Sequence, residues 1–397
     1  MLKNKNIIIG ITGSIAAYKI AILASNLKKL NANVTVIMTK NATNFINPIT
    51  FDTLTGNKCI VDTFDRNFQY NVEHIALAKS CDLFLVAPAS ANIIGKLANG
   101  ICDDMLTTTF MACKCTKLLA PAMNTGMYEN PILQDNLKKL ETYGISMISP
   151  NVGYLACGDV GNGKMAEADT LLESIIENLL YEKDMIGLHL LVSAGPTKEY
   201  IDPVRFISND STGKMGYAIA KIAKYRGANV TLVSGPTNLP TISGVKQIDI
   251  TSAKEMFDAI TSNIGTNTIV IKSAAVADFT PAVTHSNKVK KSDASNILQL
   301  EKTKDILAYL GTIKNELSLY LCGFSMETQD LLENSMKKLQ EKSLDMIAAN
   351  SLTTKGAGFG TDTNIVTLIG RDYIKELPIM SKEEVADELL NYIMSKI

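Results

Sequence analysis

The chain has 397 residues, 46% of them hydrophobic and 20% charged, which suits two to three soluble globular domains. Its formal net charge is −1 at pH 7, so bulk electrostatics give no indication of binding to nucleic acid or to an anionic membrane. An apolar stretch of the roughly 18 residues that a membrane helix needs is absent from the sequence. Seven cysteines make an odd number, which disfavours a disulfide framework and predicts a reducing, cytoplasmic compartment.

Short aliphatic runs alternate with helical patterns through the first half of the chain. The segment 15–30 has apolar residues at helical spacing, and a further helix is expected at 167–181. The strands are continuously apolar, which is typical of a parallel sheet covered on both faces. We therefore expect a doubly wound α/β domain. Its strands are predicted at 7–11, 34–38, 83–87, 117–120 and 145–148.

The second half repeats this alternation after a polar segment, 182–187, that is typical of a linker. We place the domain boundary there, giving domains at 1–186 and 187–397. Strands are predicted at 190–193, 230–234, 268–272, 320–324, 346–349 and 365–369, and helices at 213–226, 253–263, 327–342 and 381–397. The second domain is therefore also expected to be α/β.

Three motifs of the first domain directly follow predicted strands. Segment 10–18 contains Gly13 and Ser14 at a strand-to-helix turn, where free N–H groups favour a phosphate. Segment 88–92 contains Ser90, and segment 121–124 ends in Asn124, whose neutral amide suits a carboxylate. In an open α/β sheet, ligands bind beyond the carboxyl ends of the strands. Helix capping and turn formation explain the same residue types equally well.

Histidine and cysteine supply the remaining candidates of this half. His74 precedes a helix and is one of only three histidines, although a lone histidine is more often structural. Cys157 lies in the glycine-rich segment 153–164, where a reactive thiol on a flap competes with a plain flexible turn. Cys113 and Cys115 form a C-x-C pair without a second pair or a nearby histidine, which favours packing in a core over a zinc site.

Together, these motifs resemble the flavin-containing cysteine decarboxylases, a homo-oligomeric family in which they occur in the same order. The resemblance implies a flavodoxin-like or Rossmann-like sheet. It implies that His74 is an acid/base, that Asn124 binds the substrate carboxylate and that Cys157 donates a proton. It also implies an FMN site, which we assign to Gly13, Ser14, Ile15, Ala16, Pro88, Ser90, Asn92, Met105 and Thr107.

The second domain contains three polar segments that suit a nucleotide. Segment 193–199 includes Gly195 at a strand-to-loop junction, and segment 202–216 includes Arg205 and Asn209 before a helix. A well-capped polar loop explains the latter segment too. Ala274, Ala275 and Asp278 follow a predicted strand, where small residues allow a base or ribose to approach. Three lysines, Lys288, Lys290 and Lys291, lie in a loop that is able to close over a triphosphate; a solvated surface is the alternative.

The order of these segments resembles phosphopantothenate–cysteine ligases, which implies a second Rossmann-like domain. With the first half, the resemblance covers nearly the whole chain and extends to fused bacterial enzymes of coenzyme A biosynthesis. It implies that Asn209 supports an acyl-cytidylate, that Lys288 lies on a closing loop and that Asp278 is the candidate Mg²⁺ ligand. Further substrate or nucleotide contacts are expected from Lys164, Arg205, Gly195, Ala274, Ala275, Asp278, Lys290, Lys291, Asp305, Ile306, Phe324, Lys338 and Lys342.

The implied reactions are a CTP-dependent ligation of phosphopantothenate with cysteine and an FMN-dependent decarboxylation of the product. CTP acts as co-substrate, Mg²⁺ or Mn²⁺ neutralises the triphosphate, and a trimer-based dodecamer with ligase dimers is expected. Lys164 stands where the family usually has arginine, so the charge is kept but the bidentate fork is lost.

Three other functions compete with this interpretation. A regulatory flavoprotein of the same fold would bind FMN without catalysis, but such relatives can lack the full set His74, Asn124 and Cys157 that is present here. A peptidyl-cysteine decarboxylase would leave the second domain without a role. A nicotinamide dehydrogenase would need G-x-G-x-x-G and an acidic residue about 20 residues later, and neither is found.

Overall fold

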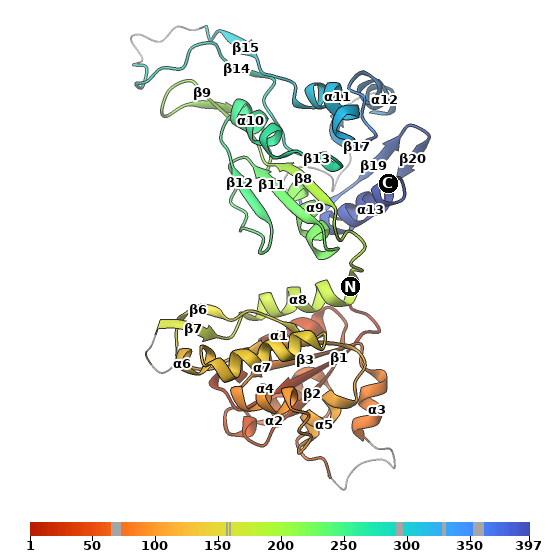
Figure 1. Ribbon diagram of the computed structural model, residues 1–397. Coiled ribbons are helices and arrows are strands. Elements are labelled where there is room, and N and C mark those ends of the chain that lie inside the picture. The colour runs from red at the N-terminus through yellow and green to blue at the C-terminus, as the bar shows by residue number, and fades with distance from the viewer. Residues whose placement is uncertain (65–72, 156–157, 159, 291–296, 328–330, 352–360) are drawn as a thin grey trace. The chain divides into compact units, whose positions relative to one another are not determined.

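The computed structural model describes all residues except 65–72, 156–157, 159, 291–296, 328–330 and 352–360 (Figure 1). The chain forms two compact units, Met1–Tyr181 and Glu182–Ile397. Across the described residues, the helices are all too short or too polar to span a bilayer.

The first unit is built on a parallel sheet with strand order β2-β1-β3-β4-β5. The strands are β1 (Asn6–Ile11), β2 (Asn33–Met38), β3 (Leu83–Ala89), β4 (Thr116–Pro121) and β5 (Ser146–Met147). This is the flavodoxin-like order, and it confirms the predicted doubly wound sheet. A two-stranded hairpin, β6 (Asn151–Tyr154) with β7 (Val160–Lys164), lies apart from the sheet.

Helices cover both faces of this sheet, as the continuous aliphatic strands predict. Ile7, Ile9 and Ile11 join one core, which includes residues of α1 (Tyr18–Lys29) and α8 (Ala168–Leu180). Ile8 points into the opposite core, with α4 (Ala91–Ala98), α5 (Met105–Ala112) and α7 (Pro131–Thr142). Each fully buried side chain of this size contributes roughly 1.5–3 kcal/mol. The smaller elements are η1 (Ile15–Ala17), η2 (Ala42–Asn44), α2 (Pro48–Thr55), α3 (Glu73–Ser80) and α6 (Thr125–Tyr128).

The second unit contains an eight-stranded sheet with order β12-β11-β8-β13-β16-β17-β19-β20. Its first six strands are parallel and follow the Rossmann order. They are β8 (His189–Ala194), β11 (Asn229–Ser234), β12 (Lys246–Asp249), β13 (Thr268–Lys272), β16 (Tyr320–Glu327) and β17 (Met346–Ser351). The sheet is mixed, because β19 (Val366–Gly370) pairs antiparallel with β17 and with β20 (Tyr373–Glu376).

Among the described residues, five helices and three short two-stranded pairings complete this unit. The helices are α9 (Lys214–Tyr225), α10 (Ala253–Asn263), α11 (Ile306–Leu317) and α13 (Lys382–Met394), and α12 (Leu331–Glu341) packs on β17. The antiparallel pairings join β9 (Lys198–Tyr200) to β10 (Phe206–Ser208), β14 (Phe279–Pro281) to β15 (Leu300–Lys302), and β18 (Thr363–Asn364) to β21 (Met380–Ser381). Glu327 was predicted to begin a helix, but it is the last residue of β16.

The segment 182–187 was predicted as a linker, and this is wrong in one respect: it packs against the second unit. Met185 is fully buried, and its N–H donates to the Arg226 carbonyl at 2.9 Å. The Arg226 guanidinium donates to Asp184 and also to Asp387 and Asn391 of α13. The polar composition predicted a linker, but Asp184 is paired with Arg226 and Lys183 donates to the Tyr225 carbonyl, both in the second unit.

Candidate functional site

In the first unit, the loops after β1 and β3 meet where the strand order reverses. The chain runs from β1 to β2 on one side and then crosses to β3 on the other, so the carboxyl ends of β1 and β3 are neighbours. This switch point is where ligands bind in open α/β sheets. Two of the three predicted loops of this unit, at 10–18 and 88–92, therefore lie side by side.

Thr12 fastens these two loops together. Its hydroxyl donates to the Pro88 carbonyl at 2.6 Å and accepts from the Ser90 N–H at 3.1 Å. Thr12 is only 2% exposed, so both bonds are shielded from water. We did not predict this residue, because its partners lie 76 and 78 positions away and leave no local pattern.

Both predicted serines act as helix caps, which was the competing interpretation. Ser14 Oγ accepts from the Ala16 N–H at 3.3 Å at the start of η1, and Ser90 Oγ accepts from Ile93 N–H at 3.4 Å at the start of α4. A hydroxyl that accepts one bond still has its proton to donate. Capping and anion binding are therefore compatible at these positions. Gly13 is required by space, because a Cβ there would lie 2.9 Å from Asn41 Cβ.

The other predicted flavin contacts differ in how they face their surroundings. Asn92 is exposed on the first turn of α4. Met105 is 1% exposed and packs in the core, so its side chain is directed inward. Thr107 completes a capping box with Asp104, whose carboxylate it contacts at 2.8 Å. Only Asn92 of these presents its side chain to solvent.

Asn124 lies at the base of the β6–β7 hairpin. Its side-chain oxygen accepts from the Gly126 N–H at 2.8 Å and caps α6. On one side of it, the Met123 N–H donates to the Gly163 carbonyl at 3.0 Å, and on the other, the Thr125 hydroxyl donates to the Asn162 carbonyl at 2.8 Å. The hairpin that carries the 153–164 flap is thus bonded to the loop that carries Asn124.

Glycine is needed at this contact. Gly163 has φ +117°, and a Cβ there would lie 2.3 Å from the Met123 carbonyl oxygen. Cys157 lies outside the described residues. His74 is half-buried on the first turn of α3, and it is not one of the residues that these hydrogen bonds connect.

Lys164 is the last residue of the 153–164 flap, and it shares the Glu167 carboxylate with Lys19, a residue that we did not predict. Glu167 accepts a hydrogen bond from Lys19 at 2.8 Å and lies 3.7 Å from the Lys164 amine. The bond from Lys19, together with both positive charges, lowers the pKa of Glu167. Lys19 is 7% exposed, on the buried side of α1. The available signal was a lysine inside an apolar helical pattern.

The second unit has its own switch point, between β8 and β13, and the predicted motifs converge on it. Ala275 N–H donates to the Gly195 carbonyl at 3.0 Å, and Ala274 N–H donates to the Ser193 hydroxyl at 3.3 Å. Asn209 donates from Nδ2 to the Ala275 and Val276 carbonyls, at 3.1 and 3.2 Å. A residue predicted for catalysis is thereby held against a segment predicted for nucleotide binding.

A cavity of about 140 Å³ opens beside this switch point. It is lined by the start of α9, which begins at Gly213 without a side-chain cap, so the first N–H groups and the positive helix end face a ligand. Phe324, for which a nucleotide contact is predicted, is one of the residues that line it. Asn350 Oδ1 is buried there and has no hydrogen-bond partner among the described residues. Such an atom calls for a donor from a ligand or water.

Cations also line this cavity, although none of these was predicted. Lys214 pairs with Asp362 at 2.6 Å, and Lys382 is 7% exposed. Burial lowers the pKa of Lys382, and the positive charge of Lys214 lowers it further. Two ammonium groups next to a helix N-terminus make the cavity suited to an anion.

A second charged group lies at the end of β13. Lys342 pairs with Asp305 at 2.7 Å, and burial lowers the pKa of the nearby Lys272 to about 8. Asp278 is exposed on the loop that follows and, with Asp305, opposes the shift at Lys272. Lys338 lies on α12, four residues before Lys342, which directly follows that helix, and its side chain is exposed. Lys272 was not predicted, since it reads as the last residue of an aliphatic strand.

Two residues that are predicted to contact substrate or nucleotide, Ile306 and Arg205, have side chains that are engaged within the protein itself. Ile306 is 1% exposed in the core, so only its backbone is available to a nucleotide. Arg205 donates from Nε to the buried Asp202 carboxylate at 2.9 Å and from its terminal nitrogen to the Val289 carbonyl at 2.9 Å. These bonds hold the pKa of Asp202 well below its usual range. Arg205 thus fastens the loop that carries Lys288 and Lys290, both exposed, while Lys291 lies outside the described residues.

Family comparisons match both units. Residues 1–180 match the family described as Flavoprotein, and residues 185–397 match the DNA/pantothenate metabolism flavoprotein C-terminal domain. The Coenzyme A biosynthesis bifunctional protein CoaBC of Bacillus subtilis is 46% identical over 397 residues, covering 99% of this chain and 97% of the relative. The proteins of that name from Haemophilus influenzae and Borreliella burgdorferi are 41% and 42% identical, covering 100% and 99% of this chain and 98% and 100% of theirs.

Proposed function

This chain belongs to the family of bifunctional coenzyme A biosynthesis proteins, and we propose that its two units catalyse successive steps of one conversion. It is a bifunctional enzyme with a flavoprotein decarboxylase unit followed by a ligase unit. In our proposal the second unit joins phosphopantothenate to cysteine with CTP, and the first unit decarboxylates the product with FMN.

The residues around the first switch point fit FMN. Ser14 and Ser90 bring hydroxyl groups and helix N-termini suited to one phosphate. Ile15 and Tyr18, both more than half exposed, supply apolar surface for a flat ring. When bound, FMN supplies the two-electron redox chemistry that makes the substrate carbon able to release CO₂.

The protein's own residues then bind the substrate and move protons. We assign the substrate carboxylate to the neutral amide of Asn124, which holds it without making its loss harder. Cys157, which lies in the sequence between β6 and β7, donates the final proton, and His74 acts as acid and base at the substrate thiol. The Lys164 ammonium faces substrate anions from the end of the same hairpin.

In the ligase unit, a carboxylate oxygen of phosphopantothenate attacks the α-phosphorus of CTP, and pyrophosphate leaves. The cysteine amine next attacks the acyl carbon, and CMP leaves. We assign to Asn209 the support of the acyl-cytidylate, and to Lys272 and Lys342 the neutralisation of the phosphate charge. Asp278, with an exposed carboxylate on the adjoining loop, suits Mg²⁺, which prefers oxygen ligands and retains waters.

One observation carries the ligase assignment: the paired hydrogen bonds from Asn209 to the Ala275 and Val276 carbonyls at the second switch point. They place the proposed catalytic amide on the backbone of the proposed nucleotide segment. A dehydrogenase cofactor site would instead be expected at a glycine-rich turn after β8, where this chain has Gly195-Pro196.

The test follows both steps in one reaction. Purified protein is incubated with phosphopantothenate, cysteine, CTP and Mg²⁺, and products are identified by mass. Wild type is expected to give phosphopantetheine, CO₂ and CMP. The Asn209→Asp variant should accumulate acyl-cytidylate but decarboxylate supplied phosphopantothenoylcysteine normally, while Cys157→Ser should stall after CO₂ loss. A yellow protein that forms neither CMP nor CO₂ would overturn the proposal in favour of a regulatory flavoprotein.

We further propose a cytoplasmic homo-oligomer, built from decarboxylase trimers and ligase dimers into a dodecamer. The position of His74 outside the bonded loops supports completion of the first site by another copy. Light scattering after size exclusion tests this: a monomer that retains full decarboxylase activity would contradict it.

A further inference from the structure

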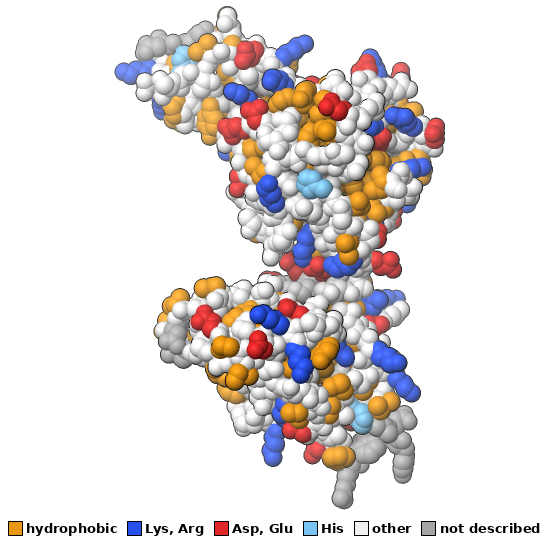
Figure 2. Space-filling model, in the orientation of Figure 1, with side chains coloured by type: hydrophobic (Ala, Val, Ile, Leu, Met, Phe, Trp, Pro, Cys, Tyr) orange, Lys and Arg blue, Asp and Glu red, His pale blue; other side chains and the backbone are white. Residues whose placement is uncertain are grey.

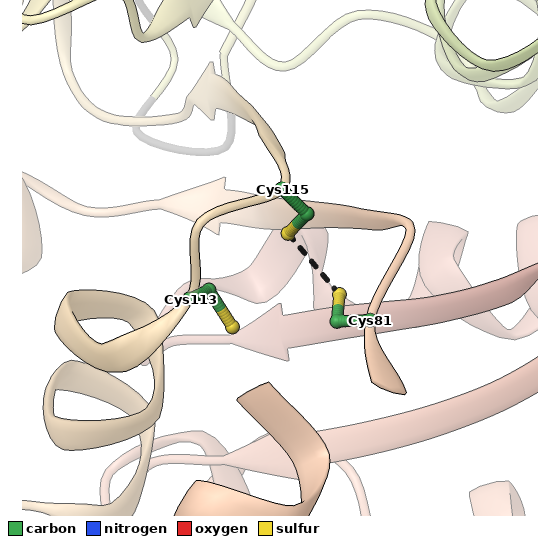
Figure 3. A group of neighbouring side chains, drawn as sticks. All are labelled: Cys81, Cys113 and Cys115. Carbon is green, nitrogen blue, oxygen red and sulfur yellow. Dashed lines mark hydrogen bonds between the residues drawn. The ribbon is translucent and has the colours of Figure 1, made fainter. Parts of the chain in front are cut away.

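Three cysteines from distant parts of the chain meet at the amino edge of the first sheet. Cys81 follows α3 and leads into β3, Cys113 ends α5, and Cys115 precedes β4. Their sulfur atoms all lie within 4.8 Å of one another, and those of Cys81 and Cys115 are 3.3 Å apart (Figure 3). The pairing of Leu83 with Thr116 in the parallel ladder produces this meeting. A C-x-C pair that lacked a partner in the sequence thus gains a third sulfur in the fold.

The spacing of the sulfurs suits a shared metal ion. Bonds of about 2.3 Å from Zn²⁺ to thiolate sulfur place tetrahedral sulfurs roughly 3.8 Å apart. The Cys81 and Cys115 sulfurs, 3.3 Å apart, lie slightly closer than that value, and no pair of the three is separated by more than 4.8 Å. The three sulfurs are therefore close enough together to contact one ion.

The surroundings favour a soft ion. Cys113 is 3% exposed within the core, and Cys81 and Cys115 are partly buried against the same core. No histidine or carboxylate joins the group in the described part of the chain. Thiolate-rich sites without oxygen ligands select thiophilic metals over Mg²⁺ and Ca²⁺.

Charge balance favours a divalent ion in particular. Lys117 lies near the cluster, with its ammonium 4.9 Å from the centre of the Phe110 ring, and its positive charge acts on Cys113 and Cys115. Three thiolates are neutralised by one divalent cation and one lysine, whereas a monovalent ion would leave a buried negative charge.

We propose that Cys81, Cys113 and Cys115 bind one divalent thiophilic cation of the zinc class, with the fourth coordination position open to water. Binding forms three sulfur–metal bonds and releases three thiol protons to solvent, without any change of oxidation state. The ion joins the end of α3 to the end of α5 and the start of β4. Because this edge is opposite the loops after β1 and β3, the site is separate from the proposed flavin site.

The direct test is a Co²⁺ titration of the full-length protein, reduced with a phosphine and stripped of metal. We expect one Co²⁺ per chain, the visible bands of a tetrahedral thiolate site, and displacement by Zn²⁺. Cys81→Ser and Cys115→Ser should weaken binding by more than about 100-fold, since loss of only an outer-shell partner costs roughly 10- to 100-fold. Cys102→Ser, at an exposed cysteine on the α4–α5 loop, and Cys157→Ser should bind as wild type does.

Thermal melting guards against misfolded variants. Zn²⁺ should raise the melting temperature of wild type and of Cys102→Ser, but not of Cys81→Ser, whose metal-free melting should match metal-free wild type. The proposal fails if reduced wild type shows no thiolate bands, or if Cys81→Ser and wild type bind equally. It also fails if the cluster only forms a Cys81–Cys115 disulfide and the reduced protein binds no metal.

Discussion

The two switch points of this chain use different chemistry to present a ligand site. In the first unit, the loops are joined by neutral groups: the Thr12 hydroxyl, two serine caps and an asparagine cap. In the second, lysine ammonium groups paired with carboxylates surround the loops, as at Lys342 and Asp305. Figure 2 shows both charge signs scattered over the surface of each unit, so the contrast is local. It fits a cofactor with one phosphate and a large ring in the first unit, and a triphosphate in the second.

The largest expected effect comes from a substitution that disrupts only the site of the first unit, which we call the neutral site. In Gly163→Ala, the new Cβ would lie 2.3 Å from the Met123 carbonyl and push the flap away from Asn124. A misplacement of about 1 Å costs roughly 100-fold in rate, so we expect decarboxylation of supplied phosphopantothenoylcysteine to fall by about that factor. CMP formation by the ligase unit should be unchanged.

Gly144→Ala is the matched control for this variant. Gly144 also has positive φ, +81°, but a Cβ there has no neighbour within 4 Å. It shares the backbone strain and lacks the clash. If both variants lose decarboxylase activity equally, strain rather than flap placement explains the loss.

The second prediction concerns a substitution in the site of the second unit, where lysines are paired with carboxylates. Lys342→Met leaves Asp305 unpaired next to the triphosphate position. Removing one partner of a hydrogen-bonded charge pair costs least when the pair is partly exposed to solvent, and for such a pair the cost is about 2 kcal/mol. We therefore expect the kcat/KM of the ligase reaction to fall by roughly 30-fold. Adding Asp305→Asn should recover part of the loss. Lys337→Met, at a 71% exposed lysine on α12, the helix that ends just before Lys342, should change neither activity, and an equal loss there would refute the role of Lys342.

Much of the fold was predictable because both sheets are buried on both faces. Aliphatic runs such as 7–11 and 268–272 need no alternation when helices cover each side, and they mark the strands to within a residue or two. Helical patterns were predicted between these strands, but the bounds of α4 to α7 were not, although Asn130-Pro131 is a helix-start signal that could have been used. The short hairpins bury few residues and leave a weak pattern.

The candidate sites were predictable where loop chemistry is local and not where partners are distant. Gly195, Asn209 and Ala275 stood out as small or polar residues after strands, and the fold brings them together. Thr12 and Cys81 take their importance from residues more than 30 positions away. No single-chain pattern carries that information, because it arises from the order of strands in the sheet.

The third prediction uses pH to distinguish the two sites. Burial lowers the pKa of Lys272 to about 8, so this lysine is charged at pH 7.5 and becomes neutral as the pH rises past 8. Anion binding favours the charged form, and affinity for CTP should therefore fall, by about tenfold between pH 7.5 and pH 9. Calorimetric titration measures it. Lys272→Arg should bind CTP with no such fall, whereas retention of FMN should be flat over this range in both proteins.

The smallest expected effect comes from a substitution in the neutral site at a residue to which no ligand contact is assigned. Thr12→Val leaves the Pro88 carbonyl and the Ser90 N–H without their shared partner, at a cost of about 1–3 kcal/mol in the free energy of unfolding of the first unit. FMN should dissociate a few-fold faster because the two loops separate. Thr109→Val is the matched control, since Thr109 is equally buried but bonds only to the Met105 carbonyl of its own helix. Thr12→Ser, which keeps the hydroxyl, should retain FMN as wild type does. If Thr109→Val releases FMN as fast as Thr12→Val, the loss reflects general destabilisation, and hydrogen-bonded loops do not form the neutral site.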